Sequence, residues 1–320
     1  MSAVVFRIKK MLQLSKNQNK FSYLIIGGGS VGTAVAHFLL NNLGISSKDI
    51  FLCKREGPSF FQHRFETNHK TYQIETESPS PDKLQKINLC FVCVKAFDLK
   101  QALLQHLSAI NPKACVVILC NGFLNEELNP VISTFSSFKW RQGVATLGIS
   151  KAGDQCYALK SLSGQITWGP LMPEKGRPLT SELFLLKQDV FGVFSWRNNI
   201  KPLVMKKWLF NTVINTLSVV KNTSNNKLLL DYQSELESLF VEGFHLAEKI
   251  FGEPWSETYD GLFEDMVLLI ENTGGNENSM HRDVIEKRKT ESSYLAGLAL
   301  RYDNEFPLLC SLHQSIISNS

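Results

Sequence analysis

The apolar residues of this chain follow two different periods, and the change between them divides it into two halves. In the first half, short apolar runs that we interpret as strands alternate with helical stretches; these runs are 21–26, 49–55, 87–94 and 115–120, with further strands over 140–169. From residue 201 the apolar positions repeat at helical spacing, over 203–220, 232–251, 257–272, 279–300 and 308–317. This order predicts an α/β domain over 21–198, followed by an all-helical domain over 199–320.

A glycine-rich stretch follows the first strand and opens the next helical segment: Gly27, Gly28, Gly29, Ser30, Val31 and Gly32. This is a G-x-G-x-x-G pattern between a strand and a helix, the context in which it binds a dinucleotide pyrophosphate. Gly27 permits the tight turn, Gly29 lets a phosphate approach the backbone, and Gly32 lets the helix pack closely on the strand. We therefore predict a Rossmann-type dinucleotide-binding domain; a simple glycine-rich turn is the alternative.

The second strand ends in two cations, Lys54 and Arg55. An NAD-binding domain places an acid near this point for the ribose 2′-hydroxyl, whereas cations suit a 2′-phosphate. The pattern therefore favours NADP over NAD, although Glu56 would reverse the argument if the turn were shifted by one residue. Two solvated cations are the alternative. Residues 57–86, which contain three prolines, are interpreted as a looser region.

Two further polar residues follow strands directly, Lys95 after 87–94 and Asn121 after 115–120. Open α/β sheets bind ligands at the carboxyl ends of their strands, so we expect both side chains at the cofactor rim. The alternative is turn chemistry, because Asn121-Gly122 is a common turn pair.

In the helical half, Lys207, Asn211 and Asn215 stand four residues apart and line one stripe of the 203–220 helix. An apolar stripe lies beside it and should face the core: Phe210, Val213, Ile214 and Leu217. A lysine next to amides forms a small polar site that can hold a carboxylate or a hydroxyl. A solvated helix face is the alternative.

Three more polar residues in this half are candidates for a site. Asn225 lies in a polar stretch that we interpret as a turn, and Ser279 lies near the start of a helix, where a capping role is the alternative. Glu291 is either a solvated carboxylate or the partner of a buried lysine.

Composition narrows the functional classes. The chain has 320 residues and a net charge of +4, and outside residues 1–20 no dense Lys/Arg block suggests a nucleic-acid surface. No apolar run reaches the ~18 residues of a membrane span, so we expect a soluble, cytoplasmic protein. Residues 1–20 form a basic segment, interpreted as an unstructured extension in preference to a transit peptide.

The cysteines and histidines do not suggest a metal site. Cys90 and Cys93 have a C-x-x-C spacing, but residues three apart in a strand point to opposite faces. No pair among the seven histidines has a zinc-ligand spacing, so we expect no metal and reduced structural thiols.

These motifs together resemble the ketopantoate reductase (2-dehydropantoate 2-reductase) family over nearly the whole chain after residue 20. The matching pieces are Gly27–Gly32, Val94-Lys95-Ala96, Cys120-Asn121-Gly122, Lys207 to Asn215, Asn225, Asn278-Ser279-Met280 with Asp283, and Thr290-Glu291 with Gly297. Each is short, and their order and spacing make the resemblance specific.

The resemblance implies reduction of a small 2-keto acid, ketopantoate, to pantoate by NADPH, a step towards pantothenate and coenzyme A, by a monomer or homodimer. Lys207 matches the family's proton donor and Glu291 a catalytic position. The substrate contacts match Asn121, Asn211, Asn215, Asn225, Asn276 and Ser279. Lys95, Asn121 and Glu291 match positions where cofactor and substrate meet.

Three departures from the family concern the substrate pocket. Leu124 stands where the family often has a second glycine, Asn226 replaces a common glycine, and the spacer before Ser279 is unusually rich in Asn and Gly. Two alternatives therefore stay open. One is an NADP-dependent reductase of another 2-keto acid or of an imine; the other is a non-catalytic NADP-binding regulator.

Overall fold

The computed structural model describes residues 21–54, 60–67, 70–153, 155–159, 164–171, 177–275 and 278–318, so the basic extension, Arg55 and Asn276 lie outside the described residues. The chain forms two compact units. The first contains the described residues up to Val94 together with Asp98–Cys120 and Glu127–Ile200. The second contains Lys95–Phe97, Asn121–Glu126 and the described residues from Lys201 onward. Two short loops from the first half of the sequence therefore belong structurally with the helical half.

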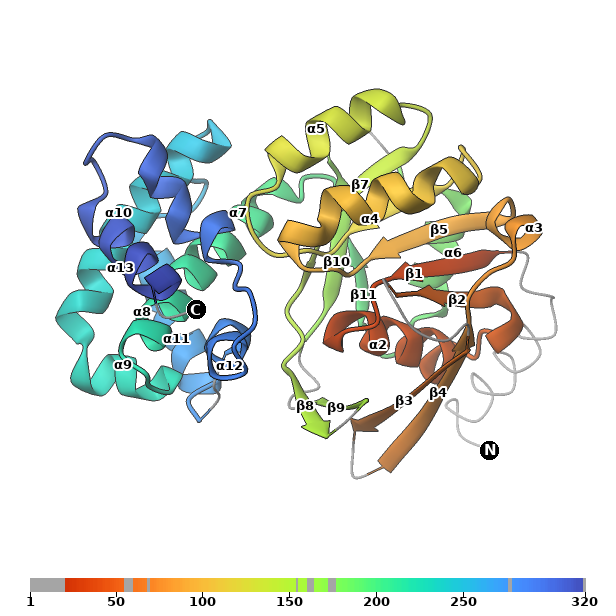
Figure 1. The fold of residues 1–320 in the computed structure, drawn as a ribbon, viewed down its shortest axis with the longest axis horizontal. Coiled ribbons are helices and arrows are strands. Elements are labelled where there is room, and N and C mark those ends of the chain that lie inside the picture. Colours follow the sequence, from red (N-terminus) through yellow and green to blue (C-terminus); the bar gives the residue numbers. More distant parts are fainter. Residues whose placement is uncertain are drawn as a thin grey trace, which may run out of the picture. The chain divides into compact units, whose positions relative to one another are not determined.

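The first unit is built on one sheet (Figure 1). Its described strands are β1 (Ser22–Ile26), β2 (Ile50–Cys53), β3 (Phe60–Thr67), β4 (Lys70–Glu77), β5 (Ile87–Val92), β6 (Cys115–Ile118), β7 (Lys139–Ala145), β8 (Ile149–Gly153), β9 (Cys156–Leu159), β10 (Ile166–Pro170) and β11 (Phe194–Trp196). They lie in the order β11-β10-β7-β6-β5-β1-β2-β4-β3-β9-β8. The run β4-β2-β1-β5-β6-β7 is parallel and has the Rossmann strand order, in which the order of strand addition reverses between β1 and β5.

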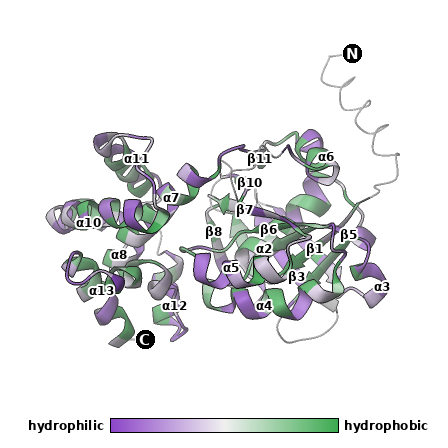
Figure 2. Ribbon diagram, turned by 90° about the horizontal axis from the view of Figure 1, so that it is seen from above, coloured by the Kyte–Doolittle hydropathy of each residue, from purple (hydrophilic) through white to green (hydrophobic). Residues whose placement is uncertain are grey.

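Helices cover both sides of this sheet. They are α2 (Ser30–His37), continued by a π-turn (Phe38–Asn42), α3 (Pro81–Leu84), α4 (Leu99–His106), α5 (Asn125–Thr134) and α6 (Thr180–Gln188), with 3-10 turns at Ser47–Asp49, Ala96–Asp98 and Leu107–Ala109. Figure 1 shows α4 and α5 together on one side of the strands and α2 on the other. The mixed colouring in Figure 2 along α4, and along α10 (Gln233–Phe251) of the second unit, is that of helices with one apolar face.

The core of this unit explains the apolar runs of the sequence. Tyr23 and Ile25 of β1, Phe91 of β5 and Trp168 of β10 are fully buried in one cluster with α2 and α6. Strands in a sheet covered on both faces read as continuous apolar runs, which is why these strands were predictable.

Parts of the first unit differ from the expectation. Residues 57–86 were expected to be loose, but β3 and β4 form an antiparallel hairpin, with Arg64 paired to Gln73. Its strands alternate buried and exposed positions, so neither contains an apolar run. Helix α5 was not expected either; it contains Pro130 and few buried apolar residues.

The second unit is helical. Its helices are α7 (Lys201–Phe210), a π-turn (Asn211–Asn215), α8 (Thr216–Val220), α9 (Asn225–Asp231), α10 (Gln233–Phe251), α11 (Tyr259–Asn272), α12 (Ser279–Ile285) and α13 (Pro307–Ser318), with 3-10 turns at Ser292–Tyr294 and Ala296–Arg301. The predicted α/β-then-helical organisation is therefore confirmed.

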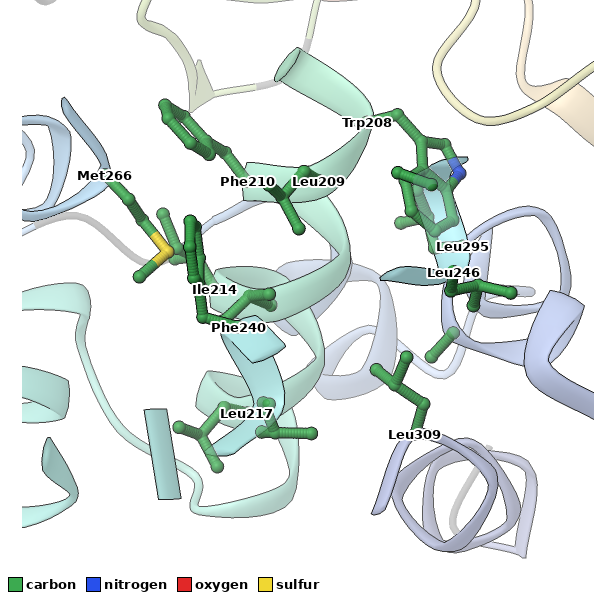
Figure 3. Close-up of a cluster of buried hydrophobic side chains, with 14 of the residues drawn as sticks. Trp208, Leu209, Phe210, Ile214, Leu217, Phe240, Leu246, Met266, Leu295 and Leu309 are labelled. Carbon is green, nitrogen blue, oxygen red and sulfur yellow. The ribbon is translucent and has the colours of Figure 1, made fainter. Parts of the chain in front are cut away.

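A continuous segment from α7 through the π-turn to α8 runs through the core of this unit, and Figure 3 shows its apolar side chains among those of the surrounding helices. The predicted apolar stripe is confirmed, because Phe210, Val213, Ile214 and Leu217 are all buried. Gly243 of α10 allows close approach, since a β-carbon there would lie 2.8 Å from Leu209 Cδ1.

Two expectations about this half were wrong. Asn225 is the first residue of α9 and not part of a turn, because Leu228 supplies a buried anchor for a short helix there. The stretch expected as one helix over 279–300 ends at Ile285. Lys287 then adopts a left-handed φ of 52°, and only 3-10 turns follow.

Candidate active site

The glycine-rich turn connects β1 to α2 and is held between two neighbouring strands. The Gly27 amide donates to the Cys53 carbonyl at the end of β2 (2.9 Å), and the Cys93 amide beyond β5 donates to the Ile26 carbonyl (2.7 Å). Gly27 has a φ of +106°, which L side chains rarely adopt. The turn therefore lies at the carboxyl ends of β1, β2 and β5, where the strand order reverses.

The individual glycines fit a dinucleotide. A β-carbon on Gly32 would lie 1.9 Å from the Gly27 carbonyl oxygen, so this position admits only glycine. Gly29 is exposed and has no atom within 4 Å of the position of a β-carbon, which leaves room for a phosphate. Ser30 and Val31 begin α2, so their amides lie at the positive end of its dipole.

Lys54 lies directly against this turn. A β-carbon on Gly28 would meet Lys54 Cε at 2.4 Å, so the aliphatic part of the lysine side chain passes over Gly28. Its Nζ atom is 2.7 Å from His63 Nε2 on β3. The lysine thus brings a cation next to the glycine-rich turn.

A second polar cluster lies in the helical unit, around Glu291. This side chain is 5% exposed, and one carboxylate oxygen accepts the Ala96 amide at 3.0 Å. The other oxygen is 3.4 Å from Asn121 Nδ2 and 3.6 Å from Lys95 Nζ. Of the two interpretations of Glu291, the structure supports the partner of a lysine, and that lysine is Lys95.

Asp283 is the second anion of this cluster. It is 3% exposed, and its carboxylate is 2.6 Å from Lys95 Nζ and 2.9 Å from an Arg288 guanidinium nitrogen. Burial alone would lower the pKa of Lys95, but the attraction of Glu291 and Asp283 outweighs burial and raises it. Lys95 is therefore a firmly charged ammonium near neutral pH.

The carbonyl of Tyr294 connects this cluster to the helix that carries Lys207. It accepts a hydrogen bond from Trp208 Nε1 at 3.0 Å and another from the Phe123 amide at 3.1 Å. Gly122 approaches the same residue so closely that a β-carbon would lie 2.6 Å from Tyr294 Cβ. The segments bearing Lys207, Asn121 and Glu291 are thus held together at Tyr294.

The structure also locates the remaining residues of the predicted stripe. Lys207 and Asn211 are half-buried and Asn215 is buried, and Asn211 and Asn215 begin and end the π-turn. π-turns inside α-helices occur frequently at functional sites. A fully solvated helix face is inconsistent with this burial.

Helix α12, which begins at the exposed Ser279, packs against the π-turn and α8. Its N-cap is Asn278, whose side chain accepts the His281 amide at 3.0 Å and donates to Ser218 Oγ. Ser218 Oγ in turn donates to the Asn215 carbonyl at 3.1 Å. The start of α12 is thereby fixed relative to the Lys207 stripe.

Asn225 is 6% exposed, and only one of its two side-chain polar atoms has a hydrogen-bond partner among the described residues. Its amide nitrogen donates to Thr273 Oγ1 at 3.1 Å, but its buried Oδ1 atom has no hydrogen-bond partner in the part of the chain that the structure describes. Buried polar atoms normally have partners, so this oxygen stands out as an unsatisfied acceptor.

Two residues of these clusters were not among the sequence candidates. Asp283 was noted only as part of a family motif; it is 188 residues from Lys95 in sequence, and nothing in the sequence of α12 pointed to so distant a lysine. His63 lies on the hairpin that was expected to be loose. The alternation of Tyr72 and Ile74 with polar residues in the sequence of β4 was the available signal.

Comparison with known families decides how these observations are interpreted. Residues 23–173 match the family described as Ketopantoate reductase PanE/ApbA, and residues 199–319 match Ketopantoate reductase PanE/ApbA C terminal. The chain belongs to the ketopantoate reductase family. It is therefore an oxidoreductase of a dinucleotide-binding family, as the resemblance implied.

Individual relatives agree with this assignment. The 2-dehydropantoate 2-reductase of Yersinia pestis is 25% identical over 236 residues, which cover 73% of each chain. The probable 2-dehydropantoate 2-reductase of Bacillus subtilis has the same fold, with a TM-score of 0.74 over 94% of this chain and all of that one, at 20% identity. D-mandelate dehydrogenase, solved with NADH and anilino(oxo)acetate, superposes with a TM-score of 0.74 over 93% of this chain and 98% of its own, at 17% identity.

Within the described ranges, no helix combines the length and the apolar character that crossing a bilayer requires. No group of three or more His, Cys, Asp and Glu side chains in the same ranges is arranged to hold a metal ion. All seven cysteines carry free thiols.

Proposed function

We propose that this member of the family reduces ketopantoate to pantoate with NADPH. The observation that carries the proposal is the set of polar side chains that the helical unit orders around Tyr294 and the π-turn. A regulator that only binds NADP would not need them. The curated relatives that it matches along most of its length are named for this reaction.

NADP is the proposed cofactor because of Lys54. Its ammonium lies next to the glycine-rich turn, on the side of β2, where a dinucleotide-binding domain recognises the adenosine ribose. A cation at that point favours a 2′-phosphate over a free hydroxyl. Arg55 is proposed as a second cation for the same phosphate.

Lys207 is proposed as the proton donor. When bound, NADPH supplies the hydride that the C2 carbonyl carbon accepts. As negative charge develops on the carbonyl oxygen, the Lys207 ammonium donates a hydrogen bond and then its proton, so that the ketone becomes an alcohol. The neutral amine regains a proton from water, which balances one keto acid, one NADPH and one proton against one hydroxy acid and NADP⁺.

The amides and Ser279 are proposed to hold the rest of the substrate. Asn211 and Asn215 can donate to its carboxylate, and the unpaired Oδ1 atom of Asn225 can accept a hydrogen bond from its hydroxyl. Asn121, Asn276 and Ser279 are the remaining proposed contacts. Lys95 and Glu291 are proposed to contact the cofactor, with Glu291 keeping the lysine oriented.

The test is NADPH oxidation with ketopantoate, followed at 340 nm, for the wild type and for Lys207→Ala. Loss of a general acid costs about 10²- to 10⁴-fold in kcat. NADPH binding by the variant should stay unchanged. Lys206→Ala is the matched control, because its lysine pairs with Glu257 and Asp265 at the surface and should turn over normally.

Two outcomes would contradict different parts of the proposal. Normal turnover by Lys207→Ala would remove Lys207 from the proton-donor role. A wild type that oxidises NADPH with another 2-keto acid, or with an imine, but not with ketopantoate would keep the reductase and change its substrate. Leu124, which is buried in the Asn121 segment, is the first residue to test in that case.

A further inference from the structure

His63 lies at the centre of a buried polar network behind the glycine-rich turn. It is 3% exposed on β3, and its two ring nitrogens contact different elements. Nε2 is 2.7 Å from Lys54 Nζ, and Nδ1 is 3.0 Å from Thr33 Oγ1 on α2. Thr33 Oγ1 is in turn 3.4 Å from the carbonyl oxygen of Gly28.

The chemistry of these groups fixes the direction of each hydrogen bond. A lysine ammonium has no acceptor, so Lys54 donates and His63 Nε2 accepts. The ring proton of the neutral imidazole is then on Nδ1 and is donated to Thr33. The threonine hydroxyl can then donate a hydrogen bond to the Gly28 carbonyl oxygen. The network thus runs in one direction, from the lysine to the glycine-rich turn.

The histidine ring is held by packing as well. It stacks on Tyr157 of β9, with ring centroids 5.9 Å apart and an angle of 12° between the planes. The Tyr157 hydroxyl also lies 3.5 Å from the Gly28 carbonyl oxygen. His63 therefore contacts the end of β2, α2 and β9. These contacts fix the ring, with Nε2 directed at the Lys54 ammonium.

We propose that His63 is a positioning residue for cofactor specificity, which holds the Lys54 ammonium against the glycine-rich turn where it recognises the adenosine 2′-phosphate. The inference rests on the proposed use of NADPH. A free lysine side chain samples many rotamers and loses that freedom when it binds a phosphate. Because His63 orders Lys54 in advance, the lysine side chain loses less conformational entropy when it binds the phosphate. The gain in affinity is therefore restricted to the cofactor that carries the phosphate.

The experiment measures direct binding of NADPH and NADH, by nicotinamide fluorescence and without keto acid. His63→Ala should weaken NADPH binding on the order of tenfold, as expected for losing one hydrogen bond to a charged group. NADH binding should change less than about twofold, because only the phosphate contact depends on Lys54. Lys54→Met should give the same pattern with a larger loss.

His63→Gln separates positioning from packing. Its amide oxygen can reach the place of Nε2 and accept from Lys54, so most of the NADPH preference should return. Thr33→Val, which removes the hydroxyl that accepts the Nδ1 proton, should lose part of the preference for NADPH. His106→Ala, a half-buried histidine on α4 of the same unit, is the matched control and should keep the wild-type ratio.

The outcomes are distinguishable from a failure of the proposed reaction. If the wild type binds NADH as tightly as NADPH, the cofactor assignment and this inference both fall. If the wild type prefers NADPH but His63→Ala keeps the preference, or His63→Gln restores none of it, His63 has no positioning role. Absence of turnover with ketopantoate would leave these binding ratios unaffected.

Discussion

Removing Glu291 should loosen the loop that carries Lys95 and Ala96. The Glu291 carboxylate accepts the Ala96 amide, contacts Asn121 and pairs with Lys95. Glu291→Ala breaks all three interactions at once. Glu291→Gln keeps an oxygen for the Ala96 amide but cannot pair with the ammonium.

The magnitude follows from these contacts. A unit charge pair at 3.6 Å is worth about 4–5 kcal/mol at an effective dielectric constant near 20. The Lys95 side chain is 36% exposed and keeps Asp283 at 2.6 Å, so solvent and the second carboxylate reduce the net loss to about 1–2 kcal/mol. A buried amide left without an acceptor adds about 1–3 kcal/mol. Glu291→Ala should therefore lower the free energy of local opening at Ala96 by about 3 kcal/mol.

Hydrogen exchange of the peptide that contains Ala96 is the appropriate assay, because it reports local opening. At pH 7.5 the ion pair is complete, since the pKa of Lys95 is raised above its ordinary 10.5 and the pair's contribution is lost only as pH rises through that higher value. The Ala96 amide should exchange about a hundredfold faster in Glu291→Ala. In Glu291→Gln the Ala96 amide should exchange about tenfold faster than in the wild type.

Glu271→Ala is the control, because it removes an exposed carboxylate from α11 and should leave the Ala96 peptide unchanged. Exchange of that peptide within about threefold of wild type in Glu291→Ala would refute the reasoning. It would mean that the Ala96 amide is protected by something other than the carboxylate.

Two further predictions concern the first unit. Gly32→Ala places a β-carbon 1.9 Å from the Gly27 carbonyl oxygen, so it should lower both the melting temperature and dinucleotide affinity, whereas Gly29→Ala should lower affinity alone, since nothing lies within 4 Å of its β-carbon. Equal melting temperatures for the two variants in a thermal-shift assay would contradict this geometry. Burial raises the pKa of the Cys53 thiol to about 11, so its alkylation by iodoacetamide at pH 8 should be about a hundredfold slower than that of glutathione, as measured by mass spectrometry.

What could be predicted from the sequence was what local patterns determine. The glycine-rich turn could be interpreted residue by residue, because the backbone requirements at Gly27 and Gly32 act over a few residues. The buried stripe of α7 and α8 followed from its period. The lysine and amide stripe was also visible, but only the resemblance to a family raised it above a surface face.

What could not be predicted depends on contacts between distant parts of the chain. The pairing of Lys95 with Asp283 and Glu291 joins a loop after β5 to α12 and the 3-10 turns beyond it. The role of His63 required the β3–β4 hairpin, which lies in the proline-containing stretch 57–86 that was interpreted as a loose region. In both cases the residue types were evident, whereas their partners were set by tertiary structure.

The π-turn at Asn211–Asn215 shows how the fold improves on the pattern in the sequence. In a regular α-helix, residues four apart are rotated about 40° past each other, so a stripe of three drifts around the surface. Lys207 to Asn211 is α-helical, but the wider π-turn rotates less per residue and reverses the drift before Asn215. We therefore expect Lys207 and Asn215 to come back towards one line, while Val213 and Ile214 are buried in the core. The local departure from helical geometry keeps the polar stripe together without giving up the apolar one.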